Sequence, residues 1–139
     1  MAPKKFSDDL AIDCQIRPDD MAELAAQGYR SVLCARPDGE EPGQPSNAEM
    51  QAAAQAAGLA FLNIPVDPKN ITMADVEAFS EAMEELPLPM YGYCRTGKRV
   101  ASLWALSQAE EQDTDTLLDT AARAGFDLSE LRHKLQMLG

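Results

Sequence analysis

The chain has 139 residues, 45% of them hydrophobic and 25% charged, which is the length and composition of one soluble globular domain. The 23 Asp and Glu residues outnumber the 12 Lys and Arg residues, and the resulting formal net charge of -11 repels nucleic acids and anionic membrane surfaces. No stretch approaches the roughly 18 apolar residues of a membrane helix, and the N-terminus lacks the apolar run of a signal peptide. Three cysteines without paired spacing fit a reducing compartment. We therefore expect a single cytoplasmic domain over residues 1–139, with no nucleic-acid or membrane partner.

Short apolar runs alternate with helical segments along the first half of the chain. Residues 10–16 are the first predicted strand, and the proline and acidic residues after it predict a helix that ends at Gly28. A second strand over 31–35 leads into residues 36–45, a loop rich in turn formers. Ser46, with a glutamate three positions later, has the spacing of a capping box and predicts the start of the second helix.

The same alternation continues toward the C-terminus. Residues 59–66 are the third predicted strand, and Thr72 is a candidate cap for a helix that two prolines end. Residues 90–93 are the fourth strand, and the apolar segment 100–106 is typical of a helix buried at the centre. Two more helices follow. This order predicts an α/β fold with a central, mainly parallel sheet of about four strands flanked by helices, with functional residues on the loops at the carboxyl ends of the strands.

One cysteine lies where the fourth strand meets the buried helix, in the segment Cys-Arg-Thr-Gly-Lys-Arg over residues 94–99. The first N–H groups of a helix lack partners and can hold an anion, and cations beside a cysteine stabilise the negative thiolate. We expect Cys94 to be largely thiolate at neutral pH and to act as a nucleophile. Four residues are predicted to form the anion-binding loop: Arg95, Thr96, Gly97 and Lys98.

The strand, Cys-x-x-Gly-x-Arg loop and helix resemble the active sites of cysteine-dependent phosphatases and rhodaneses. More closely, four segments resemble, in order and spacing, the phosphatase-like domain of beta-lactamase hydrolase-like proteins. They are Arg-Pro-Asp-Gly-Glu at 36–40, Gln-Pro at 44–45, Ile-Pro-Val at 64–66 and Cys-Arg-Thr-Gly-Lys-Arg at 94–99. The resemblance covers about residues 7–110 and implies a dual-specificity-phosphatase-like fold. It also implies that Cys94 is the nucleophile and Arg99 the arginine that binds the anion.

The length of this loop departs from the phosphatase pattern. Phosphatases of this superfamily have five residues between the cysteine and the arginine, which would place the arginine at Val100 instead of Arg99. The shorter loop resembles that of single-domain rhodaneses, and a smaller anion cradle suits sulfur better than a tetrahedral phosphate. Tyr93 also replaces the histidine that commonly precedes the nucleophile, and Thr96 or Ser102 would have to supply the hydroxyl that usually follows the arginine.

Three hypotheses follow for the function. The first is a sulfurtransferase in which Cys94 carries sulfane sulfur as a persulfide, received from a small anionic or persulfide donor and passed to a thiol. The second is a phosphomonoester hydrolase that acts on a phosphorylated substrate through a phosphocysteine, with Asp67 as general acid, although Asp67 equally fits a simple Asp-Pro turn. The third is a non-catalytic module that binds an anion or a phosphopeptide.

The remaining candidates have structural explanations beside the functional ones. Arg36 could contact the substrate or form an ion pair with neighbouring acids, and Asp38 could contact the substrate as well. Cys34 is either a resolving thiol or a small buried strand residue. The loop after the second strand also carries three alternatives to Asp67 as the general acid, namely Asp38, Glu40 and Glu41. His133, the only histidine, has no partner at metal-ligand spacing, so we expect neither a metal nor a cofactor.

Overall fold

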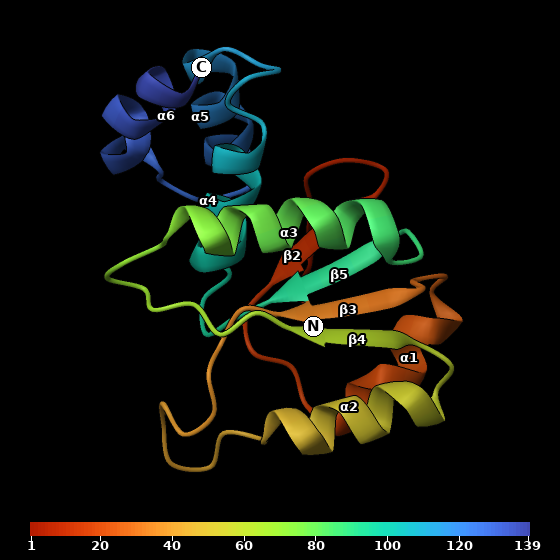
Figure 1. The fold of residues 1–139 in the computed structure, drawn as a ribbon. Helices are drawn as coiled ribbons and strands as arrows, with labels where there is room; N and C mark the ends of the chain where they lie inside the picture. Colours follow the sequence, from red (N-terminus) through yellow and green to blue (C-terminus); the bar gives the residue numbers. More distant parts are fainter.

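The computed structural model describes all residues 1–139 and contains one five-stranded sheet with helices on both faces (Figure 1). The strands are β1 Lys4–Lys5, β2 Leu10–Asp13, β3 Ser31–Cys34, β4 Ala60–Asn63 and β5 Met90–Tyr93. They lie in the order β1-β2-β5-β3-β4, and every neighbouring pair is parallel except β1 with β2. The predicted α/β fold with a mainly parallel sheet is confirmed. The expected count of four strands is one too low, because β1 consists of two exposed lysines and has no apolar pattern.

Three of the predicted strands, 10–16, 31–35 and 59–66, are shorter than expected, since the chain leaves the regular ladder before the apolar run ends. Beyond β4, the N–H of Ile64 still donates to the carbonyl of Cys34 at 2.8 Å, and that of Val66 donates to the carbonyl of Ala35 at 3.3 Å. These bonds hold the extended chain beside β3 as far as Val66. The loop that begins at Asp67 is therefore positioned at the carboxyl edge of the sheet.

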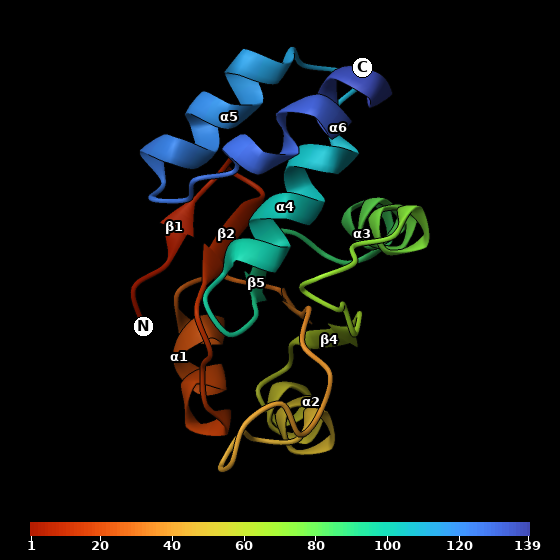
Figure 2. The same cartoon turned by 90° about the vertical axis from the view of Figure 1, so that its left-hand side faces the viewer.

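The helices form two layers, one on each face of the sheet (Figures 1 and 2). Their bounds are α1 Met21–Ala26, after a short 3-10 turn over Pro18–Asp20, α2 Asn47–Ala56, α3 Met73–Glu85, α4 Lys98–Ser107, α5 Thr114–Arg123 and, after a 3-10 turn over Ser129–Leu131, α6 Arg132–Leu138. The predicted caps are confirmed, since Ser46 accepts from the N–H of Glu49 and Thr72 from that of Asp75, each at 3.1 Å. None of these helices is both long and apolar enough to cross a membrane.

The sheet separates two hydrophobic clusters. The larger cluster joins β2, β3 and β5 to α3, α4, α5 and α6, and the smaller one lies beneath α1 and α2. Every residue from Val100 to Leu106 is buried, which confirms the central helix expected from the sequence. Burial on all sides fixes the position of α4, and with it the first helical turn beside Cys94.

The packing of β5 against α4 requires a residue without a side chain at Gly92. A Cβ atom placed there would lie 2.8 Å from Cγ1 of Val100. We expect Gly92→Ala to lower the free energy of unfolding by about 1–3 kcal/mol, because overpacking of a dense core displaces its neighbours. Urea unfolding followed by circular dichroism measures this change.

Val100→Ala provides the matched control, since it removes the methyl group that the new Cβ would meet. The double variant should lose less stability than the sum of the two single variants. Strictly additive losses would show that the contact between these two positions is not the cause.

Candidate active site

The backbone between β5 and α4 turns so that an N–H group faces the Cys94 sulfur. The N–H of Gly97 donates to Sγ of Cys94 at 3.1 Å. Gly97 has a φ of 92°, and a Cβ there would lie 2.8 Å from Cζ of Phe126 and 3.2 Å from the carbonyl oxygen of Asp13. Only glycine fits both this conformation and this space, so the turn that directs an N–H at the sulfur depends on it. The next residue, Lys98, begins α4.

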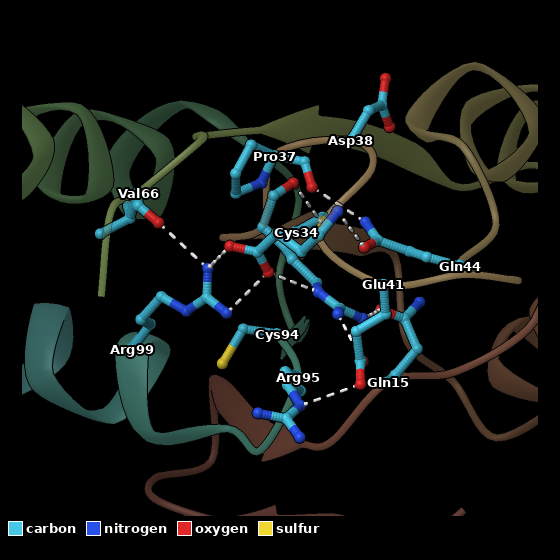
Figure 3. A network of polar contacts seen from close by, with 12 residues as sticks. Gln15, Cys34, Pro37, Asp38, Glu41, Gln44, Val66, Cys94, Arg95 and Arg99 are labelled. Carbon is cyan, nitrogen blue, oxygen red and sulfur yellow. Dashed lines mark hydrogen bonds and ion pairs between the residues drawn. The ribbon is translucent and has the colours of Figure 1, made fainter. Parts of the chain in front are cut away.

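Arg99 lies on the first turn of α4 and is held by a carboxylate from a different loop. Its two terminal nitrogens donate to the two carboxylate oxygens of Glu40, each at 2.9 Å, and one of them also donates to the carbonyl of Val66 at 3.0 Å. The Arg99 side chain is only 8% exposed. In Figure 3 the Cys94 side chain is drawn below this guanidinium group, with its sulfur directed away from it. Cys94 and Arg99 belong to the same short segment at the start of α4, and 0% of Cys94 is exposed.

A second buried arginine shares the same carboxylate. Nε of Arg36 donates to Glu40 at 2.6 Å, and its terminal nitrogens donate to Glu41 at 2.6 Å and to the side-chain oxygen of Gln15 at 2.9 Å. We call the arrangement of Arg36, Glu40 and Arg99 the arginine bridge. Because all three donor nitrogens of Arg36 are bonded to protein oxygens, its ion pairs are formed as the sequence suggested, and its role as a substrate contact stays a prediction.

The arginine bridge also determines the protonation of Glu40. The guanidinium of Arg99, and to a lesser extent that of Arg36, hold the pKa of this carboxyl below its usual range, against the opposing effect of partial burial. Glu40 is thus ionised at neutral pH and has no proton to donate. Its role in this structure is to orient Arg99.

The two predicted aspartates both make local turn or cap contacts. Asp67 is exposed, and its carboxylate accepts the N–H of Lys69 at 2.9 Å within the turn that follows β4. Asp38 accepts the N–H of Asn47 at 2.7 Å, at the start of α2. Asp67 follows Val66, whose carbonyl contacts Arg99, so it is the nearer of the two along the chain to the site. The general-acid role of Asp67 and the substrate contact of Asp38 stay predictions.

Cys34 and Tyr93 lie on the other face of the sheet from the Cys94 thiol. Cys34 belongs to the cluster beneath α1 and α2, whereas Cys94 belongs to the larger cluster. Burial raises the pKa of the Cys34 thiol, which donates to the carbonyl of Arg36 at 3.5 Å. Burial also raises the pKa of Tyr93, whose hydroxyl has no hydrogen-bond partner. Cys34 is a neutral thiol at physiological pH, and its role as a resolving thiol stays a prediction.

A cleft of ≈ 540 Å³ opens beside the Cys94 loop. Three segments line it, namely the loop after β4, the Cys94 loop with the first turns of α4, and the segment that leads into α6. The lining residues are Pro68, Lys69, Asn70, Ile71, Arg95, Thr96, Lys98, Arg99, Ser102, Glu130, Leu131 and Lys134. The predicted loop residues Arg95, Thr96 and Lys98 thus face one cleft, as does the alternative hydroxyl of Ser102. No group of three or more side chains is arranged to hold a metal ion.

Sequence reasoning missed the partners that complete this site. Neither the clamp of Glu40 on Arg99 nor the lysines on the far walls of the cleft follow from local patterns, because Glu40 is 59 residues from Arg99 and Lys69 and Lys134 come from other distant segments. The one available signal was an acidic pair, Glu40 and Glu41, in the loop that follows β3, a strand parallel to β5.

The elements that form this site match those of a known protein family. The sequence profile of the phosphatase-like domain of beta-lactamase hydrolase-like proteins matches residues 4–111, from β1 through the Cys94 loop and α4. The chain belongs to this family of phosphatase-like domains. A beta-lactamase hydrolase-like protein from Agrobacterium fabrum is 40% identical over 131 residues, which is 92% of this chain and 30% of that protein. The phosphatase-like domain therefore spans less than a third of the curated relatives it matches.

Solved structures confirm the fold expected for the phosphatase-like domain. A candidate phosphatase from Neisseria meningitidis superposes with a TM-score of 0.90 at 33% identity, covering 100% of this chain and 99% of that one. The catalytic domain of a PP-IP phosphatase from S. cerevisiae, solved with citrate, superposes with a TM-score of 0.74 at 15% identity, covering 97% and 83%. The latter match shows the fold alone. Together the comparisons support the phosphatase hypothesis better than the sulfurtransferase hypothesis that the loop length had favoured.

The arginine bridge generates a prediction about stability. Glu40→Gln removes the charge between two buried guanidinium groups, and we expect it to lower the free energy of unfolding at pH 7 by about 1–2 kcal/mol, a value reduced for the partial exposure of the carboxylate. Because the folded protein lowers the pKa of Glu40, this stabilisation is complete above the unfolded value of about 4.3 and is lost as the pH falls through the folded pKa. The difference between wild type and variant should therefore shrink below about pH 4.

Urea unfolding at a series of pH values measures this difference, with Glu81→Gln as the control. Glu81 is an exposed glutamate of α3 that forms no ion pair. Equal losses of stability in the two variants would contradict the proposed importance of the bridge.

Proposed function

We propose that this domain is a cysteine-dependent phosphatase that hydrolyses phosphomonoesters through a phosphocysteine at Cys94. The observation that carries the proposal is the hydrogen bond from the Gly97 N–H to the Cys94 sulfur, in a loop at the carboxyl end of a central strand that leads directly into the clamped Arg99. Membership of the phosphatase-like family and the match to the Neisseria meningitidis structure support the same assignment.

The proposed chemistry has two steps. The thiolate of Cys94 attacks phosphorus, an S–P bond forms, the bond from phosphorus to the ester oxygen breaks, and the departing oxygen takes a proton. Water then attacks the phosphocysteine, and inorganic phosphate and the thiolate are released. Arg99 and the N–H groups of the loop stabilise the charge on the phosphoryl oxygens.

The surroundings of Arg99 support this role because they hold it in place before the substrate arrives. Glu40 and the carbonyl of Val66 fix the guanidinium by three hydrogen bonds, so little conformational freedom remains to be lost on binding. Since Cys94 is fully buried in this conformation, a substrate reaches the sulfur only after the loops around it separate. Asp67 is the proposed acid, because its loop begins next to the carbonyl that contacts Arg99.

Phosphate release from a panel of phosphomonoesters tests the proposal. Cys94→Ser should abolish turnover, because a hydroxyl in this setting is not ionised. Asp67→Asn should lower kcat by about 10²-fold for alkyl esters, whose leaving oxygen needs a proton, and by much less for p-nitrophenyl phosphate. Asp113→Asn is the matched control, since Asp113 is an exposed aspartate whose carboxylate accepts the N–H of Thr116 at 2.7 Å at the start of α5. Undetectable phosphate release across the panel, or release that survives Cys94→Ser, would contradict the proposal.

Sulfane sulfur transfer is the second candidate, and two observations favour it. The arginine follows Cys94 by five positions, so the loop encloses a smaller space than a phosphatase loop. The carboxylate that clamps Arg99 is also ionised and cannot give a proton to a leaving oxygen, and sulfur transfer does not need such a proton. In this chemistry the thiolate attacks the sulfane sulfur of thiosulfate, the S–S bond breaks, sulfite leaves, and the Cys94 persulfide passes its outer sulfur to an acceptor thiolate.

Mass spectrometry after treatment with thiosulfate or a persulfide donor measures this second activity. If sulfur transfer occurs, a mass increase of one sulfur atom should be found on Cys94 in the wild type and be absent in Cys94→Ser. A lack of persulfide under conditions that load a known rhodanese would rule this candidate out.

A further inference from the structure

The cleft beside the Cys94 loop is positively charged in a strongly acidic chain. Five of the 12 Lys and Arg residues line it, against one of the 23 Asp and Glu residues. The five are Lys69, Arg95, Lys98, Arg99 and Lys134, and the acid is Glu130. Although the whole chain has a net charge of -11, such a concentration of cations raises the local concentration of an anionic ligand.

Two of the lysines, Lys69 and Lys134, lie on walls of the cleft that the Cys94 loop does not form. Lys69 is on the exposed loop after β4, and Lys134 is on α6, where its Nζ donates to the carbonyl of Ile71 at 3.1 Å. This bond joins the two walls at the side of the cleft. Neither lysine pairs with a carboxylate, so both charges are available to a ligand.

The other cations of the cleft have partners of two kinds. Nζ of Lys98 lies 2.7 Å from Glu130, and because these side chains are 47% and 63% exposed, the pair is weak and easily exchanged. Arg95, 62% exposed, lies 3.3 Å from Glu41 in a similar way. Arg99, by contrast, is held by the carboxylate of Glu40. The proposed reaction centre therefore contains one arginine, and the unpaired positive charges of Lys69 and Lys134 lie farther out in the cleft.

From this arrangement we infer that the cleft binds a second phosphate of a small, multiply phosphorylated substrate, while the first phosphate reacts at Cys94. The inference rests on the proposed phosphatase function. Lys69 and Lys134 hold the second phosphate and thereby determine specificity. The volume of ≈ 540 Å³ lies within the range of about 300–1,000 Å³ for small-molecule sites.

The lining of the cleft favours a small polyanion over a phosphorylated peptide. Only two of its 12 lining residues are hydrophobic, whereas five carry a positive charge, so the lining offers a ligand more charged groups than apolar side chains. The cations of the cleft come from three segments of the chain. Such a spread of positive charge suits a ligand that carries several separate anionic groups.

Calorimetric binding to the full Cys94→Ser chain tests the inference without turnover. The probes are inorganic tripolyphosphate and orthophosphate at low salt. Tripolyphosphate should bind at least about tenfold more tightly, since it can reach the outer lysines as well as the loop. Lys69→Gln, added to this chain, should weaken tripolyphosphate binding about tenfold and orthophosphate binding much less. Lys134→Gln should act in the same direction.

Lys4→Gln is the matched control, because Lys4 is an exposed lysine of β1 without an ion pair. Equal affinities for the two probes would overturn the inference, and so would a Lys69→Gln chain that binds tripolyphosphate as tightly as the Lys4→Gln chain does. Tighter binding of a phosphotyrosine peptide than of tripolyphosphate would also overturn it. Failure of the phosphatase proposal is seen separately, as an absence of phosphate release, whereas these outcomes concern binding alone.

Discussion

A carboxylate between two buried guanidinium groups holds the candidate site together. Glu40 receives two hydrogen bonds from Arg99 and one from Arg36, and the loop that carries it follows β3, next to β5 in the sheet. Without this carboxylate, two positive charges would be buried with fewer partners, which is costly in a low-dielectric interior. The same contact fixes the direction of Arg99, the arginine that we propose binds the reacting anion.

The arginine bridge also explains how an acidic chain builds a site for anions. Negative charge is used inside the site to orient Arg99, and the cations that remain free are placed on the walls of the neighbouring cleft. In the proposed function, the reaction centre and the region that selects the ligand are formed by different residues. A substrate with one anionic group would use the first, and a substrate with several would use both.

Two observations favour different chemistries at this site, one sulfur transfer and the other phosphate hydrolysis. The loop from Cys94 to Arg99 is one residue shorter than in phosphatases, and the structure closes it around the sulfur through the Gly97 N–H. The family and the fold, on the other hand, are those of phosphatase-like domains. Both proposed reactions use the same cysteine and the same clamped arginine, so the fate of the group carried by Cys94 distinguishes them.

The sequence by itself determined the features that depend on neighbours along the chain. Periodicity and caps located the helices that begin after Ser46 and Thr72, because helical hydrogen bonds and caps join residues close together in the chain. The strand and the helix on either side of the Cys94 loop were located by their apolar runs, since both are buried. Only the tertiary structure decided that Glu40 clamps Arg99, that Arg36 is committed to ion pairs, and that lysines from two distant segments face one cleft. These contacts join residues brought together by the packing of parallel strands and their loops, and no local pattern of residue types specifies which of many possible carboxylates or lysines will meet.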